Sequence, residues 1–252
     1  MSTSLGHIAS SLEYSLLHPI MTDADLATEL QRARDFKVAA VCVKPYSIPT
    51  AVSALQGTNV LVCTVVGFPY GDSTTNLKVF EAREAMEAGA HEVELLINVG
   101  KVLGGDWDYV RNEIQAVNQI VAPRGDLKVI FESHFLSEQQ IVELCRICTG
   151  VGVAAIKTSS GYGYVQDLCG SYRYPDTIAP QLELMKNNCG QGEVKIEAAL
   201  EIRRVREIIF FERLLGVSRV TVGEAGAAAI MGDARQLGVT DVVQVVWIPL
   251  PS

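Results

Sequence analysis

The chain has 252 residues, of which 48% are hydrophobic, and carries a formal net charge of −8 with 21 Lys and Arg against 29 Asp and Glu. This length can form one barrel-sized domain or two small ones, and the scarcity of basic residues argues against nucleic acid or an anionic membrane as a partner. Because no apolar run approaches about 18 residues and no basic region followed by an apolar one opens the chain, we expect neither a membrane span nor a secretory signal. These features predict a cytoplasmic protein.

Short apolar runs alternate eight times with amphipathic segments, which predicts parallel strands joined by crossover helices. The expected strands are Leu12–Leu17, Ala39–Val43, Val60–Phe68, Glu92–Asn98, Leu127–Ser133, Ala154–Thr158, Glu193–Ala198 and Arg219–Gly223. The expected helices are Asp23–Phe36, Asn76–Ala88, Asp106–Val121, Ser137–Thr149, Pro175–Lys186 and Ile202–Leu215, with more helix after Glu224.

Eight such units predict a closed (β/α)8 TIM barrel, although an open doubly wound sheet also fits the pattern. No linker-like stretch divides the chain, so we expect a single domain over residues 1–252. Its C-terminal tail, residues 240–252, is apolar and ends in prolines. We expect the tail to cover a barrel end or a subunit contact, and a homodimer is considered on this ground.

Six cysteines lie at positions 42, 63, 145, 148, 169 and 189. Several fall in apolar, strand-like runs, which is typical of buried free thiols in a reducing compartment. Cys145 and Cys148 form a CxxC pair, but the pair lies in a helical pattern without a second pair or a histidine at zinc-ligand spacing. We therefore expect no metal site.

In a barrel of this kind the reacting groups stand at the carboxyl ends of the strands. The polar residues at or near these positions are Glu13, Cys42, Lys44, Glu94, Asn98, Glu132, His134, Lys157, Lys195, Glu197, Thr221 and Glu224. Three of them, Glu94, Lys157 and Lys195, stand out because each lies in a run that otherwise predicts burial.

Lys157 ends the apolar run Gly152–Ile156 and precedes the small polar turn Thr158–Tyr162. Such a lysine can reach solvent, form an ion pair, or be held neutral as a nucleophile that forms a Schiff base. A second lysine on the next strand, Lys195, would lower the pKa of Lys157, and Glu94 would stabilise the remaining cation and relay protons through water. The alternative is that the three residues form an ion-pair cluster in a packed barrel.

Several short motifs, in order and at matching spacing, resemble the class I deoxyribose-phosphate aldolases over most of the chain. The sequence KTSSGY at Lys157–Tyr162 is similar to KTSTGF, which carries the Schiff-base lysine of that family. The other motifs are LEYSLLHP (Leu12–Pro19), AVCVKP (Ala40–Pro45), VGFPYG (Val66–Gly71), Lys78 with Glu81 and Ala82, EVELLIN (Glu92–Asn98), and Val194–Lys195.

The resemblance implies a (β/α)8 barrel that cleaves 2-deoxyribose 5-phosphate reversibly into acetaldehyde and glyceraldehyde 3-phosphate, without a metal or organic cofactor. Lys157 would form the imine, Lys195 would keep it deprotonated, and Glu94 would stand where the family has a proton-relaying aspartate. The substrate pocket would be lined by Glu13, Cys42, Thr158 and Ser159.

The chain departs from the family at the segments that cradle phosphate. Where the family has paired glycines after its second lysine, this chain has Ala198 and Ala199, preceded by Glu197, and Glu224 follows Gly223. Alanine adopts positive φ less readily than glycine, and a carboxylate repels a phosphate dianion. The pattern predicts an unphosphorylated substrate for this end of the pocket, unless the glutamates point away and Arg203, Arg204 or a main-chain amide binds the anion.

Two other functions remain open from the sequence. One is another imine-forming lyase or hydratase that acts on an unphosphorylated carbonyl compound. The other is a non-catalytic barrel that serves as a binding protein and forms no imine.

Overall fold

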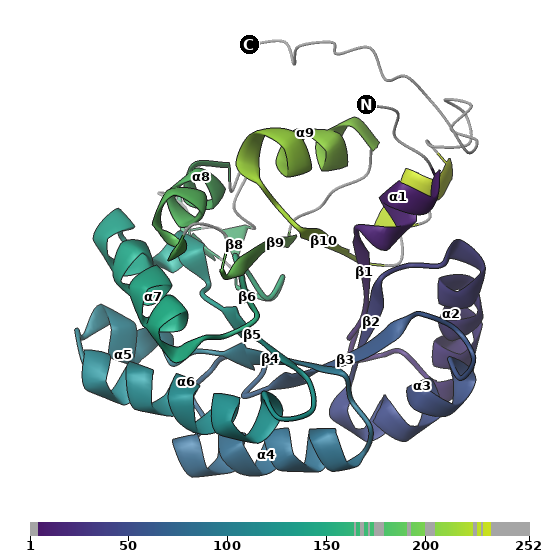
Figure 1. The fold of residues 1–252 in the computed structure, drawn as a ribbon, viewed down its shortest axis with the longest axis horizontal. Helices are drawn as coiled ribbons and strands as arrows, with labels where there is room; N and C mark the ends of the chain where they lie inside the picture. The colour runs from purple at the N-terminus through teal and green to yellow at the C-terminus, as the bar shows by residue number, and fades with distance from the viewer. Residues whose placement is uncertain are drawn as a thin grey trace.

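The fold is a closed barrel of eight parallel strands surrounded by helices (Figure 1), so the predicted (β/α)8 barrel is confirmed and the open sheet is ruled out. The computed structural model describes residues 5–163, 165–166, 169–170, 172–173, 179–190, 193–199, 205–223, 226–227 and 229–232. The barrel strands are β1 (Leu12–Leu16), β2 (Ala40–Val43), β3 (Leu61–Val66), β4 (Glu92–Leu96), β5 (Asp126–Ile130), β6 (Ala155–Lys157), β9 (Lys195–Ala199) and β10 (Arg219–Val222).

The expected helices are present as α2 (Asp23–Phe36), α4 (Thr75–Glu87), α6 (Trp107–Val121), α7 (Glu138–Val151), α8 (Ala179–Asn188) and α9 (Val205–Leu215). Residues 226–227 and 229–232 are helical, in agreement with the helix expected after Glu224. The described part of the chain holds no helix long and apolar enough to cross a membrane. The predicted tail, residues 240–252, lies outside the described residues.

The structure adds elements that the sequence pattern did not reveal. They are α1 (Leu5–Ser10), α3 (Ile48–Ala54), α5 (Val99–Leu103), the one-turn 3-10 segments Pro45–Ser47 and Ser133–Phe135, and the antiparallel pair β7 (Val165–Gln166) and β8 (Tyr172–Arg173). Each is too short to show a helical or alternating period, so only tertiary contacts stabilise it.

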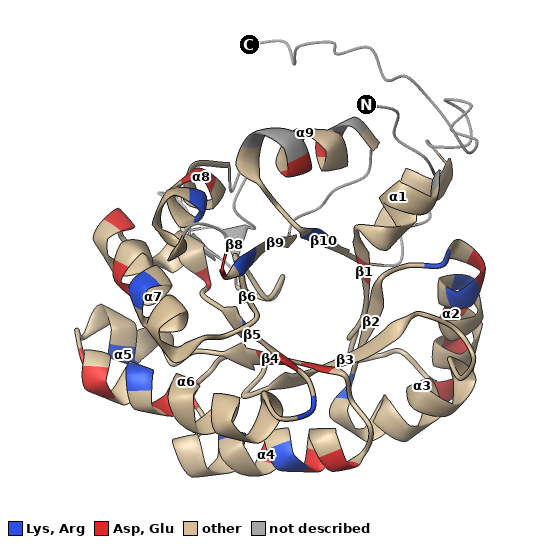
Figure 2. Ribbon diagram, in the orientation of Figure 1, with Lys and Arg blue, Asp and Glu red and all other residues tan. Residues whose placement is uncertain are grey.

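Side chains alternate along each strand, so one set packs outward against the helices and the other fills the barrel. The outward set joins the helices in one large apolar core. The barrel interior is divided: a smaller apolar cluster of Leu17, Cys42, Cys63 and Val65 lines β1–β3. The rest of the interior, including Glu13 on β1, is charged, and Figure 2 shows acidic positions on β4 within the barrel wall. The interior charged residues are Glu13, Glu92, Glu94, Lys128, Lys157 and Glu197, all buried.

A separate buried ion pair lies between the barrel and its helices. The Lys78 ammonium donates to Glu113 Oε2 at 2.9 Å and to the carbonyls of Gly71 (2.7 Å) and Leu96 (2.9 Å), and both charged side chains are fully buried. This contact anchors α4 and α6 to the loop that follows β3 and to the last residue of β4.

Replacing Lys78 with methionine is expected to lower the free energy of unfolding by about 3–5 kcal/mol, because it leaves the Glu113 carboxylate and two carbonyls buried without a partner. Urea unfolding measures this loss. The control is Lys101→Met, which removes the exposed ion pair with Asp106 and should change stability little. Equal effects of the two substitutions would contradict the assigned role of Lys78.

Candidate active site

The centre of the site is Lys157, the last residue of β6, whose side chain is almost fully buried. Its ammonium donates to Glu94 Oε1 at 2.6 Å and to Glu13 Oε1 at 3.0 Å. These carboxylates come from β4 and β1, so closure of the barrel brings three distant parts of the chain together. In this fold, catalytic groups stand at the carboxyl ends of the barrel strands. Lys157 occupies such a position, and it is buried between two carboxylates.

Glu13 is the permanently charged partner of Lys157. Burial alone would raise the pKa of the Glu13 carboxyl, but Lys128, Lys157 and Arg219 hold it well below its usual range. Thr221 Oγ1 also donates to Glu13 Oε1 at 2.9 Å. Glu13 therefore stays ionised and holds the Lys157 ammonium in place.

Unlike Glu13, Glu94 is not held in its ionised form. Burial, together with the neighbouring Glu13 charge, raises the pKa of the Glu94 carboxyl to about 7. A carboxyl with this pKa can both accept and return a proton at neutral pH, which is the requirement for a general acid–base group. Its 2.6 Å contact with the Lys157 ammonium makes that amine its proton donor.

Lys157 is protonated in the resting protein. Burial disfavours the charged amine, but Glu13 and Glu94 outweigh it and raise the pKa of Lys157. The amine must therefore lose a proton before it can attack a carbonyl, and Glu94 is the base within reach.

A second buried lysine, Lys128 on β5, is the residue that the sequence analysis missed. Its ammonium contacts four carboxylates: Glu13, Glu92 at 2.9 Å, Glu94 at 3.4 Å and Glu197 at 3.1 Å. It shares Glu13 and Glu94 with Lys157, and its charge favours deprotonation of Lys157. The same signal was present in the sequence, because Lys128 also interrupts an apolar run expected to be a strand.

Lys195 does not occupy the position that the sequence predicted, and this is a correction. The register between β6 and β9 pairs Ala155 with Lys195 and Lys157 with Glu197, so Lys195 lies two residues toward the amino end of the barrel. Its side chain is exposed there and lines a cavity at the amino end of the barrel, together with Asp126, Ser218 and the side of Lys128 and Glu197 that faces this end. Two residues along a strand span about 6.6 Å, so strand register separates this lysine from the site.

Glu197 faces the barrel interior, where it contacts Lys128 and Arg219 (3.6 Å), so it does not lie near the predicted phosphate end. Ala198 is packed outward in the apolar core. Ala199 is buried, and its amide donates to Thr158 Oγ1 at 3.1 Å, so that amide is already occupied. Gly223 is exposed after β10, whereas Glu224, Arg203 and Arg204 lie outside the described residues.

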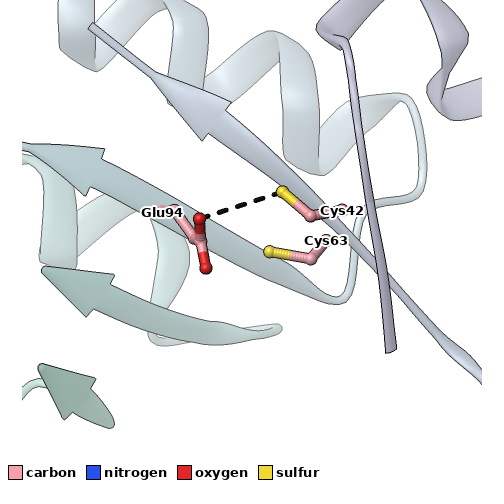
Figure 3. A group of neighbouring side chains, drawn as sticks. All are labelled: Cys42, Cys63 and Glu94. Atoms are coloured by element: carbon pink, nitrogen blue, oxygen red, sulfur yellow. Dashed lines mark hydrogen bonds between the residues drawn. The ribbon is translucent and has the colours of Figure 1, made fainter. Parts of the chain in front are cut away.

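Thr158 and Ser159, predicted to line the pocket, are both buried directly after Lys157. Cys42 points toward Glu94, as Figure 3 shows, and its Sγ lies 3.8 Å from Glu94 Oε2. Cys63, its register partner on β3, lies beside it. The contact with Cys63 lowers the pKa of the Cys42 thiol, but burial and the charges of Glu94 and Glu13 raise it by more. Cys42 therefore lines the site as a neutral thiol.

Three sets of side chains in the described residues have ligand atoms close enough together to hold a metal ion: Cys42, Cys63 and Glu94; Glu13, Cys63 and Glu92; and Glu13, Glu94 and Glu197. Lys128 or Lys157 already binds a carboxylate in each set. A metal would therefore compete with an ammonium for the same oxygens.

Comparison with known proteins places this geometry in a family. No protein-family model matches the chain. The deoxyribose-phosphate aldolase of Rhodopirellula baltica is 37% identical over 233 residues, which cover 92% of this chain and 91% of that protein.

Solved structures agree in fold. A Coccidioides immitis protein named as a candidate deoxyribose-phosphate aldolase superposes with a TM-score of 0.82 at 28% identity, over 93% of this chain and 88% of its own. The tetrameric deoxyribose phosphate aldolase of Aeropyrum pernix has a TM-score of 0.78 at 20% identity, over 93% of each chain. With the buried lysine in the matching motif and a relative of 37% identity along almost its whole length, the chain belongs to the deoxyribose-phosphate aldolase family.

Proposed function

We propose that the protein is a class I aldolase that cleaves 2-deoxyribose 5-phosphate reversibly into acetaldehyde and glyceraldehyde 3-phosphate. The observation that carries the proposal is the Lys157 amine, buried between Glu94 and Glu13 at the carboxyl end of β6. Family membership supports the choice of substrate.

Catalysis begins with transfer of a proton from the Lys157 ammonium to Glu94. The free amine attacks the aldehyde carbon C1 of the open-chain sugar and forms a carbinolamine. Glu94 returns its proton to the departing hydroxyl, and loss of water leaves an iminium that is covalently bound to Lys157. Glu13 and Lys128 keep the interior charge balanced while these protons move.

The iminium then accepts the electrons of the C2–C3 bond. The C3 hydroxyl gives its proton to the Glu94 carboxylate, which is ionised again after the loss of water, C3 becomes the aldehyde carbon of glyceraldehyde 3-phosphate, and the two carbons left on Lys157 form an enamine. Protonation of the enamine at C2 and hydrolysis release acetaldehyde and restore the amine. Every step runs forward and backward, so the same residues serve cleavage and synthesis.

The proposal is tested by incubating the protein with 2-deoxyribose 5-phosphate and measuring both aldehydes. We expect equal amounts of acetaldehyde and glyceraldehyde 3-phosphate. An imine trapped without C–C cleavage would instead support the alternative lyase or hydratase, and no imine with any of these carbonyl compounds would support the non-catalytic barrel.

Two observations bear on whether the substrate carries a phosphate, and they point in opposite directions. The Ala199 amide is already bound to Thr158, which reduces the donors available to an anion. Glu197, however, is engaged with Lys128 and does not repel a phosphate. We keep cleavage of unphosphorylated 2-deoxyribose as the second candidate activity.

Cleavage of 2-deoxyribose and of its 5-phosphate should be compared as kcat/KM under identical conditions. If the phosphate end is as weak as its sequence predicts, the phosphate ester is preferred by less than about tenfold, equivalent to about 1.4 kcal/mol. A much stronger preference for the ester would overturn the second candidate.

The rate of cleavage is expected to fall as pH drops below about 7, because protonated Glu94 cannot accept the Lys157 proton. Glu94→Gln should lower kcat/KM by about 10²–10⁴-fold and remove this acid limb. A pH–rate profile of both proteins measures the effect. An unchanged acid limb in Glu94→Gln would show that another group is responsible.

We further propose a cytoplasmic location, which is supported by the buried free thiols of Cys42, Cys63, Cys145, Cys148 and Cys189. A homodimer remains our proposal for the assembly. It is supported by exposed apolar side chains on one part of the rim, Ile20, Tyr46 and Tyr70, which follow β1, β2 and β3. Light scattering measures the assembly directly.

A further inference from the structure

The cavity at the amino end of the barrel lies opposite the end that carries Lys157, and it has a volume of about 200 Å³. Two buried residues of the interior charge cluster, Lys128 and Glu197, line it. The cavity therefore gives solvent access to the far side of the charges that surround the catalytic amine. The charged residues at the start of a strand that also line it are Glu92, Asp126, Lys195 and Arg219.

Arg219, the first residue of β10, is the cation that joins this cavity to the interior charges. Its side chain is only 17% exposed. Its Nη1 donates to both carboxylate oxygens of Glu92, at 2.6 and 2.8 Å. The same nitrogen lies 3.6 Å from Glu197 Oε1 and 3.8 Å from Glu13 Oε2. Arg219 is thus a permanent charge held between carboxylates of three strands.

The Lys128 ammonium lies between two pairs of carboxylates. The cavity-side pair is Glu92 at 2.9 Å and Glu197 at 3.1 Å. The site-side pair is Glu13 and Glu94, and the contact with Glu94, at 3.4 Å, is the longest of the four. Because Arg219 binds both members of the cavity-side pair, Lys128 does not have to neutralise that pair by itself. It can therefore keep its contact with Glu94.

Charge balance in the barrel interior also depends on Arg219. The carboxylates of this cluster are Glu13, Glu92, Glu94 and Glu197, and its cations are Lys128, Lys157 and Arg219. Acidic groups are in excess, and burial together with the Glu13 charge raises the pKa of Glu94 to about 7. Removing the Arg219 charge increases the excess, which favours the protonated form of Glu94.

The other groups that face Glu94 cannot replace this charge, since its cations are already engaged and the thiols are neutral. The titratable and charged side chains that face Glu94 from the other strands are Glu13, Cys42, Cys63, Lys128, Lys157 and Glu197.

We propose that Arg219 is a positioning residue for the aldolase reaction, which it controls from the end of the barrel opposite Lys157. By holding Glu92 and Glu197, it leaves Lys128 in contact with Glu94. Glu94 in turn stays against the Lys157 amine as an ionised base. This inference rests on the proposed function and adds to it a residue that acts only through other side chains.

The test uses Arg219→Ala, which removes the charge and leaves its space open to the cavity. We expect kcat/KM for cleavage of 2-deoxyribose 5-phosphate to fall about tenfold, because Lys128 is drawn toward the cavity-side pair. The acid limb of the pH–rate profile should move to higher pH, because the pKa of Glu94 rises when a neighbouring cation is lost.

Guanidinium chloride at millimolar concentration, far below denaturing concentrations, supplies the lost group through the cavity. It should restore part of kcat/KM in Arg219→Ala and return the acid limb toward its original pH, whereas the same concentration of sodium chloride should do neither. The matched control is Arg111→Ala, at an exposed arginine of α6 that pairs with Asp108. This variant should behave like the unmodified protein with and without guanidinium.

The position of the acid limb decides the outcome. A folded Arg219→Ala that keeps the acid limb of the unmodified protein overturns the positioning role, whatever its kcat/KM. Borohydride trapping with acetaldehyde separates this failure from failure of the proposed function. If the unmodified protein forms the adduct on Lys157, only the positioning role falls. If it forms no adduct, both fall.

Should Arg219→Ala not fold, Glu92→Gln replaces it, because this substitution keeps the shape of the side chain and removes one carboxylate from the cavity-side pair. The smaller excess of negative charge should lower the pKa of Glu94 and move the acid limb to lower pH, the direction opposite to that of Arg219→Ala. An acid limb that stays in place or moves to higher pH would overturn the inference.

Discussion

Lys157→Leu is expected to abolish cleavage, by about 10⁴-fold or more, because no other group on β6 can form the covalent iminium that withdraws electrons from the C2–C3 bond. The measurement is cleavage of 2-deoxyribose 5-phosphate together with intact mass after acetaldehyde and borohydride. The unmodified protein should gain one reduced two-carbon adduct, and peptide mapping should place it on Lys157.

Lys101→Leu serves as the control, because Lys101 is an exposed lysine paired with Asp106 outside the barrel. This variant should keep both the activity and the adduct. Circular dichroism on Lys157→Leu establishes that the barrel persists without the buried amine. An adduct that survives Lys157→Leu, or that maps to another lysine, would refute the assigned nucleophile.

The second large effect distinguishes the role of Lys128 from that of Lys195. Lys128→Met is expected to lower kcat/KM by about 100-fold, since Lys128 holds Glu94 and Glu13 in place around Lys157 and contributes its charge to deprotonation of that amine. It should also cost about 3–5 kcal/mol of stability, because it leaves buried carboxylates without a partner. Lys195→Met, at an exposed position beyond the site, should change kcat/KM by no more than about twofold.

A pH profile distinguishes an electrostatic role of Lys128 from simple loss of structure. The Lys128 charge lowers the pKa of Glu94, so its removal should raise that pKa above about 7 and move the acid limb of the reaction to higher pH. A merely unstable variant would lose activity without this shift. If Lys195→Met instead loses as much activity as Lys128→Met, the sequence-based assignment of the second lysine was right.

Much of the architecture could be read from the sequence. Apolar runs located the eight barrel strands, and amphipathic periods located six of the helices because each of these helices is long enough to show its period. α3 and α5 were missed because a helix of one or two turns carries no such signal and depends on packing. Lys157 and Glu94 were selected as candidates because a charged residue in an apolar run is conspicuous on its own.

The sequence by itself determined the barrel and the family resemblance, and it made Lys157 and Glu94 candidates for the site, since these depend on local pattern and motif order. Only the tertiary structure decided which side chains meet. The register of β9 against β6 placed Glu197 opposite Lys157 and left Lys195 outside, while barrel closure brought Lys128 and Glu13 to the same amine. Partners of this kind depend on strand register and on which face each residue takes. A shift of two residues exchanges one partner for another while the local pattern stays the same.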